Sequence, residues 1–191
     1  MLNADGSIGE MCGNGLRCFV KYAFDERIIP EDTSLVSVET DAGIMQVTPI
    51  WKSNKMTRAS VIMGEPKFHP DEVPVDAPGH EMLMDYPLLV NGRDIKITCV
   101  SMGNPHAVTF LDEPVKCINL HELGPIVEHH HIFPQRVNFE IANVIAPSRL
   151  EARIWERGSG ITMASGTGAS AVAVAARLHN YIGDKATVSF P

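Results

Sequence analysis

Apolar and polar residues alternate along the first part of the chain in the pattern of half-buried β-strands. Residues 35–40 alternate one by one, and residues 44–48 resume the pattern after a turn at 41–43. A period of two places successive side chains on opposite faces of a strand, so the pattern predicts two strands that pair across this turn. A further strand is expected over residues 58–63.

The second part of the chain contains more strands and clearer breaks between them. Asn91-Gly92, placed between two apolar runs, is the strongest short hairpin signal in the sequence. Residues 64–78 are rich in proline and acidic residues, which predicts a loop, and residues 120–130 fit a short helix. Strands are expected over residues 88–90, 95–100, 106–111, 137–145 and 150–155.

Two stretches have helical character instead. Residues 16–24 form the first, and Lys21 and Asp25 indicate that one of its sides faces water. Residues 169–176 form the second and are apolar or small all round, so we expect this helix to be buried on every side. Small residues let strands approach closely, which indicates a sheet curled around a central helix. The elements together predict an α+β fold, rich in antiparallel pairs.

The two helical stretches are introduced by similar sequences. Cys12-Gly13-Asn14-Gly15 aligns with Ser165-Gly166-Thr167-Gly168, and each motif follows a charged residue and a Gly-Ser pair. Repetition of this kind indicates a duplicated unit. Two related halves, each presenting a loop and a helix N-terminus, suggest one site that lies between them.

Cys12 is the candidate reactive side chain of the first motif. It falls at the first turn of the predicted helix, where unpaired N–H groups lower the pKa of a thiol and can also bind a carboxylate. A small buried thiol beside a turn is the alternative for an isolated Cys-Gly pair. The repeat favours the reactive interpretation.

Composition and charge exclude several classes of protein. The net charge is −7 and the basic residues are scattered, so neither nucleic acid nor an anionic membrane is an expected partner. No apolar run is long enough to span a membrane. The four cysteines do not form a disulfide framework, and free thiols indicate the cytoplasm. His129-His130-His131 lacks a second group of ligands, so we expect no metal site.

Four ordered motifs give the chain a specific resemblance to the diaminopimelate epimerase family. The resemblance covers nearly all of the sequence. The motifs are Asn3-Ala4-Asp5-Gly6-Ser7 with Met11-Cys12-Gly13-Asn14-Gly15-Leu16-Arg17-Cys18, then Gly103-Asn104-Pro105-His106, then Phe133-Pro134 with Arg136-Val137-Asn138, and finally Trp155-Glu156-Arg157-Gly158 continuing to Ser165-Gly166-Thr167-Gly168.

The resemblance implies a cofactor-independent epimerase that interconverts LL- and meso-diaminopimelate, a small-molecule substrate, for lysine and cell-wall synthesis. It implies two pseudo-symmetric halves, each a mixed, mostly antiparallel sheet curled around a central helix. Residues 1–60 would be an incomplete N-terminal half and residues 61–191 the C-terminal half. The family's chain is longer, so a segment before Asn3 and a terminal strand after Pro191 are expected. A homodimer is left open as the assembly.

The resemblance also assigns roles to individual residues. Two facing side chains would exchange a proton with the α-carbon: Cys12 on one side and the residue at position 165 on the other. His106 and Glu156 would tune this pair, and no cofactor or metal would take part. The residues expected to hold the substrate are Asn3, Gly13, Asn14, Asn104, Asn138, Glu156, Arg157, Gly166 and Thr167.

Ser165 departs from the family pattern, which has cysteine at this position. A serine hydroxyl ionises far less readily than a thiol, so it is a poor base near neutral pH. Three explanations stay open: an engineered replacement of cysteine, a natural single-base enzyme that eliminates or isomerises, and a non-catalytic remnant that binds a ligand. Activity as an epimerase is expected to be impaired.

Overall fold

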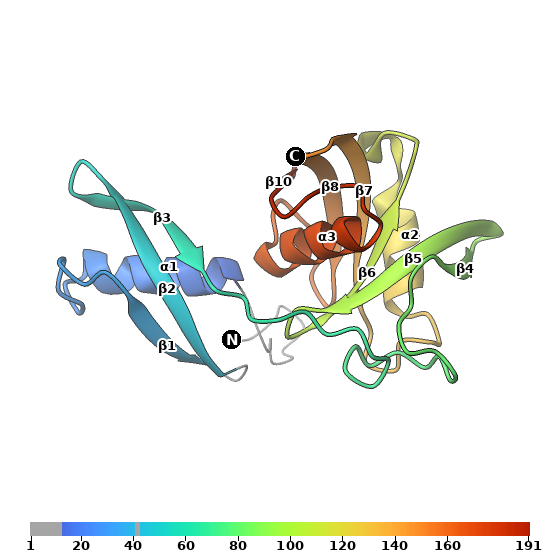
Figure 1. Ribbon diagram of the computed structural model, residues 1–191, viewed down its shortest axis with the longest axis horizontal. Coiled ribbons are helices and arrows are strands. Elements are labelled where there is room, and N and C mark those ends of the chain that lie inside the picture. The colour runs from blue at the N-terminus through green and yellow to red at the C-terminus, as the bar shows by residue number, and fades with distance from the viewer. Residues whose placement is uncertain (1–12, 41–42) are drawn as a thin grey trace.

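The computed structural model describes residues 13–40 and 43–191, which form two sheets and their covering helices (Figure 1). The α+β class predicted from the sequence is confirmed. The helices are α1 (Gly13–Asp25), the short 3₁₀ helix η1 (Val115–Cys117), α2 (Leu120–Glu128) and α3 (Gly166–Leu178). The strands are β1 (Val36–Thr40), β2 (Gly43–Lys52), β3 (Lys55–Val61), β4 (Tyr86–Val90), β5 (Arg93–Ser101), β6 (Pro105–Phe110), β7 (Asn138–Ala146), β8 (Arg149–Glu156), β9 (Gly160–Thr162) and β10 (Thr187–Ser189).

The smaller sheet is an antiparallel meander of β1, β2 and β3, with α1 packed against it. Leu16, Val20 and Phe24 recur at helical spacing and form the buried stripe of α1. The opposite side of this helix carries exposed residues such as Tyr22, as the charged positions in the sequence predicted. Burial of one stripe therefore attaches α1 to its sheet and leaves the other side in water.

The larger sheet has seven strands in the order β10-β8-β7-β6-β5-β4, with β9 paired to β8. The pairs β6–β7 and β8–β10 are parallel and the others are antiparallel, so the sheet is mixed and mostly antiparallel, as predicted. The hairpin at Asn91-Gly92 is confirmed. Both residues have positive φ (51° and 74°), which is the conformation that a tight two-residue hairpin turn requires.

Helices cover both faces of the larger sheet. Alternate residues of β7 separate the two layers: Phe139 and Ile141 join the core under α2, whereas Ala142 joins the core under α3. Ala171 and Ala175 are fully buried on the inner side of α3, where their small side chains allow close packing on the sheet. The sheet is thus the central layer of this half, and each face of it has its own core.

The expectation that α3 is buried on every side is wrong for one stripe. Ala173 and Val174 are half-buried and, with Phe68, line a shallow depression on the outer side of the helix. The sheet covers only the inner side of α3. The sequence of this helix is apolar or small all round, so it does not show which side is covered. None of the helices in the described part of the chain is long and apolar enough to cross a membrane.

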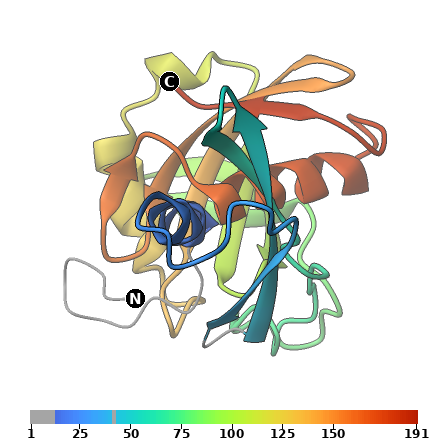
Figure 2. The ribbon, with the colours of Figure 1, turned by 90° about the vertical axis from the view of Figure 1, so that its left-hand side faces the viewer.

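The two sheets are joined by a segment without helices or strands, as expected for residues 64–78. In Figure 1 the helices α1 and α3 approach each other with their N-termini, and Figure 2 views the same arrangement from the side of α1. Contacts between the two helices confirm this approach. The division of the chain at residue 60 into an N-terminal and a C-terminal half stays a prediction.

Gly124 in α2 provides a test of the packing between α2 and the large sheet. A Cβ atom at this position would lie 2.4–2.6 Å from the ring of Trp155, which is itself held by a hydrogen bond to Glu128. Alanine improves intrinsic helix stability by about 1 kcal/mol, but overpacking costs about 1–3 kcal/mol, and a fixed ring cannot move aside. We therefore expect Gly124→Ala to lower the free energy of unfolding, measured by urea denaturation.

Gly183→Ala is the matched control, because a Cβ atom there meets no heavy atom within 4 Å. Equal stabilities of the two variants would contradict the packing described for Trp155.

Candidate active site

The N-termini of α1 and α3 meet at the junction of the two sheets. A Cβ atom on Gly13 would lie 3.5 Å from the Cα atom of Gly166, so the two backbones are separated by little more than the width of a methyl group. The Asn14 side chain donates a hydrogen bond from Nδ2 to the carbonyl oxygen of Ala164 (2.9 Å) and thereby links the two helix starts. Backbone N–H groups at both helix starts create a region that favours an anion.

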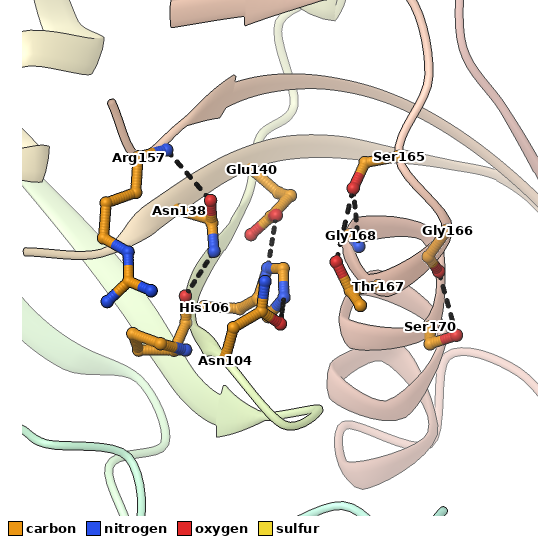
Figure 3. A network of polar contacts seen from close by, with 11 residues as sticks. Asn104, His106, Asn138, Glu140, Arg157, Ser165, Gly166, Thr167, Gly168 and Ser170 are labelled. Atoms are coloured by element: carbon orange, nitrogen blue, oxygen red, sulfur yellow. Dashed lines mark hydrogen bonds and ion pairs between the residues drawn. The ribbon is translucent and has the colours of Figure 1, made fainter. Parts of the chain in front are cut away.

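Ser165 is the N-cap residue of α3. Its backbone is extended, and its buried Oγ atom accepts a hydrogen bond from the Gly168 N–H group (3.2 Å). Oγ also lies 3.4 Å from the hydroxyl of Thr167 (Figure 3). The hydroxyl at position 165 therefore stabilises the first turn of α3.

A second group of polar residues lies where β6 and β7 begin. The two strands are parallel and place His106 beside Asn138 in register. Asn138 is buried and donates from Nδ2 to the carbonyl oxygen of Pro105 (2.8 Å), and its Oδ1 accepts from the backbone N–H of Arg157 (2.9 Å). Asn138 thus ties the start of β6 to the turn that carries Arg157.

The buried Glu128 carboxylate supports the same turn from the other side. It accepts hydrogen bonds from the indole of Trp155 (2.6 Å) and the backbone N–H of Gly158 (2.9 Å). The Arg136 guanidinium lies 3.4 Å from the same carboxylate. These bonds hold the turn on α2, so Arg157 is presented from a supported backbone.

Glu140 connects the two polar groups. Its side chain is fully buried, and its Oε1 atom lies 2.6 Å from Nδ1 of His106. Figure 3 marks this contact with a dashed line. A Cβ atom at Gly168 would lie 3.0 Å from this oxygen and 3.1 Å from Cβ of Ser165. Glu140 and Ser165 therefore lie against the same first turn of α3.

Burial dominates the electrostatics of Glu140 and raises its pKa. The charge of His106 and the bond to its ring oppose this increase, whereas the negative charge of Glu156 adds to it. The carboxyl group therefore holds a proton more readily than an exposed glutamate does.

The structure brings most of the predicted site residues to this junction. Gly13, Asn14, Ser165, Gly166 and Thr167 lie at the two helix starts. Asn104, His106, Asn138, Glu156 and Arg157 lie at the ends and turns of the neighbouring strands. Asn3 and Cys12 lie outside the described residues, although Cys12 directly precedes Gly13 in the sequence.

Glu140 and Glu128 were missed by the sequence analysis. Glu140 could have been found, because it is two residues after Asn138 on a strand and so shares its face. Glu128 had no comparable signal, since its partners come from two other segments, at residue 136 and at residues 155–158. The histidine run supplies a helix cap: His129 ends α2, and its Nδ1 atom lies 2.9 Å from the carbonyl oxygen of Pro125. Within residues 13–40 and 43–191 no cluster of side chains could hold a metal ion.

Comparison with known proteins identifies the family. The sequence model of diaminopimelate epimerase matches residues 1–69 and 98–191. The chain belongs to the diaminopimelate epimerase family. It is 46% identical to the diaminopimelate epimerase of Desulfovibrio desulfuricans over 96% of this chain and 64% of that protein. It is also 46% identical to the diaminopimelate epimerase of a Cyanothece species, over the whole length of this chain and 67% of that protein.

The diaminopimelate epimerase relatives are therefore longer than this chain, which spans about two thirds of their length. Solved structures share the fold at low sequence identity. A probable proline racemase from Agrobacterium radiobacter superimposes with a TM-score of 0.68 at 14% identity, over 95% of this chain and 57% of that chain. A hydroxyproline epimerase from Agrobacterium vitis superimposes with a TM-score of 0.64 at 14% identity, over 91% of this chain and 54% of that chain.

Asn138→Asp tests the tie between β6 and the Arg157 turn. Aspartate cannot donate to the Pro105 carbonyl and would place a carboxylate against it in a buried position. Leaving a buried acceptor unpaired costs about 1–3 kcal/mol, so we expect a loss of this size in the free energy of unfolding, measured by urea denaturation.

The control is Asn54→Asp, at an exposed turn position with φ of 59° that aspartate also tolerates. If both variants unfold at the same urea concentration, the tie through Asn138 does not stabilise the fold.

Proposed function

We propose that this protein is a cofactor-independent amino-acid epimerase that interconverts LL- and meso-diaminopimelate. Membership of the family supports the reaction class and the substrate. The observation that carries the proposal is the close approach of the α1 and α3 N-termini, which supplies one anion-binding region from two halves of the chain.

In this proposal the helix starts bind the α-carboxylate of the substrate. Backbone N–H groups near Gly13, Asn14, Gly166 and Thr167 would donate to it and stabilise the negative charge that develops when the α-proton leaves. The thiolate of Cys12 would take that proton from one face of the α-carbon. The side chain at position 165 would return a proton to the opposite face, which inverts the stereocentre.

The polar residues of the strand ends would hold the rest of the substrate. Asn3, Asn104, Asn138 and Arg157 are the proposed partners of its amino and distal carboxylate groups. A guanidinium suits a carboxylate because its planar donors match the two oxygens. Glu156 and His106 would set the protonation of the acid/base pair.

Ser165 limits the two-base reaction. Its hydroxyl already accepts from Gly168, and an alcohol is a poor base at neutral pH. One competent base opposite an alcohol suits proton removal better than inversion, so a single-base lyase or isomerase acting on a related small acid is the second candidate. A cytoplasmic location, which the free thiols indicate, is a further prediction, and a homodimer is left open as the assembly.

Incubation of LL-diaminopimelate in heavy water tests the proposal. We expect Ser165→Cys to invert the α-carbon with deuterium incorporation, at a rate at least about a hundredfold above that of the parent, because a positioned acid or base contributes about 10²–10⁴-fold. Chiral chromatography and mass spectrometry measure inversion and deuterium. Ser165→Ala is the control, since it removes the hydroxyl without adding a thiol.

The other outcomes separate the alternatives. Deuterium exchange or loss of a leaving group without inversion, in both the parent and Ser165→Cys, supports the single-base enzyme. Binding of diaminopimelate without any exchange in either protein leaves a ligand-binding role and contradicts the proposed epimerase.

A further inference from the structure

Glu140 is a fully buried carboxylate to which the proposed reaction gives no role. Its Oε1 atom lies 2.6 Å from His106 Nδ1, a distance that places a shared proton between them. Its Oε2 atom has no hydrogen-bond partner within the described residues. A buried carboxyl group with one unpaired oxygen is costly to maintain, which indicates a purpose other than stability.

The other ring nitrogen of His106 faces Asn104. Nε2 lies 2.8 Å from Asn104 Oδ1, and an amide oxygen can only accept a hydrogen bond. With the amide in this orientation, Nε2 carries a proton and donates it. Because a second proton lies between Nδ1 and Glu140, the Glu140–His106 pair holds two protons.

This bond determines which end of the Asn104 amide is available. With Oδ1 directed to His106, the Nδ2 atom and its two N–H groups point away from the ring. Asn104 is half-buried, and its Nδ2 has no partner in the part of the chain that the structure describes. The available end of Asn104 is thus a donor, which suits a carboxylate and repels an ammonium group.

We propose that Glu140 is a positioning residue that acts through His106 to make Asn104 present its N–H groups to a carboxylate of the substrate. The inference rests on the proposed function for the identity of the ligand. The chain of contacts from Glu140 through His106 to Asn104 stands on the geometry alone (Figure 3).

The surroundings of Glu140 favour retention of the second proton. His106 faces it from β6 and Glu156 acts on it from β8, whereas α3 presents Gly168 and Ser165, which carry no charge. Burial and Glu156 both raise the pKa of Glu140. Loss of the proton would leave Nε2 as an acceptor and turn the amide of Asn104 around.

Two substitutions of Glu140 separate positioning from general stability. Glutamine can donate an N–H to Nδ1 and so keep Nε2 protonated, whereas methionine has a similar length and makes no such bond. We expect Glu140→Met to weaken binding of meso-diaminopimelate about tenfold, measured by calorimetry, as for loss of one productive hydrogen bond. Glu140→Gln is expected to restore the Kd to within about twofold of the parent.

Thr109→Val is the matched control, because Thr109 is buried on the opposite face of β6 and bonds to the Lys96 carbonyl without touching His106. It removes a buried hydrogen bond and is expected to leave the Kd unchanged. Asn104→Asp tests the orientation directly. It replaces the N–H groups by a carboxylate that faces the carboxylate of the substrate, and should therefore weaken binding more than Glu140→Met does.

Nitrogen-15 NMR of the His106 ring supplies a readout that needs no substrate. We expect a protonated Nε2 in the parent and in Glu140→Gln. In Glu140→Met we expect Nδ1 to show no hydrogen bond to residue 140. If the parent does not bind diaminopimelate, the proposed function fails, whereas the ring spectrum still tests the contact chain. The inference is overturned if Nε2 is unprotonated in the parent or if Glu140→Met binds with the parent's Kd. It is also overturned if Glu140→Gln binds no better than Glu140→Met, or if Asn104→Asp binds more tightly than the parent.

Discussion

The site depends on one close approach between two helix starts. Gly13 and Gly166 bring the backbones of α1 and α3 almost into contact, and the Asn14 bond to the Ala164 carbonyl holds them together. Each helix presents backbone N–H groups at its start, and these groups add their partial positive charges in the same small region. Neither helix start supplies this combined region by itself, so the proposed chemistry requires both glycine motifs.

Local signals predicted most of the fold. Asn91-Gly92 identified its hairpin because the positive φ angles of that turn depend on these two residues alone, not on distant contacts. The repeat identified both helix starts, since Gly13 and Gly166 are the first residues of α1 and α3. Strand β9 was missed because three residues are too few to show an alternation. The half-buried stripe of α3 was missed because its sequence does not distinguish its two sides.

Most residues of the candidate site could be predicted from the sequence, but the contacts between them could not. The motif residues indicated which side chains matter, but the parallel pairing of β6 with β7 determines that His106 lies beside Asn138. Glu140 resembled an ordinary acidic residue in an apolar strand, and its position against His106 and Gly168 depends on three distant segments. Such long-range contacts also explain how Glu128 supports the Arg157 turn, and no local pattern reports them.

In the proposed site both helix starts bind one anion together. Titration of the protein with meso-diaminopimelate, followed by the backbone N–H resonances of Gly13, Asn14, Gly166 and Thr167, measures this most directly. We expect resonances from both helices to shift along curves with a single Kd, because one carboxylate receives donors from both. Shifts confined to one helix, or two different Kd values, would contradict it.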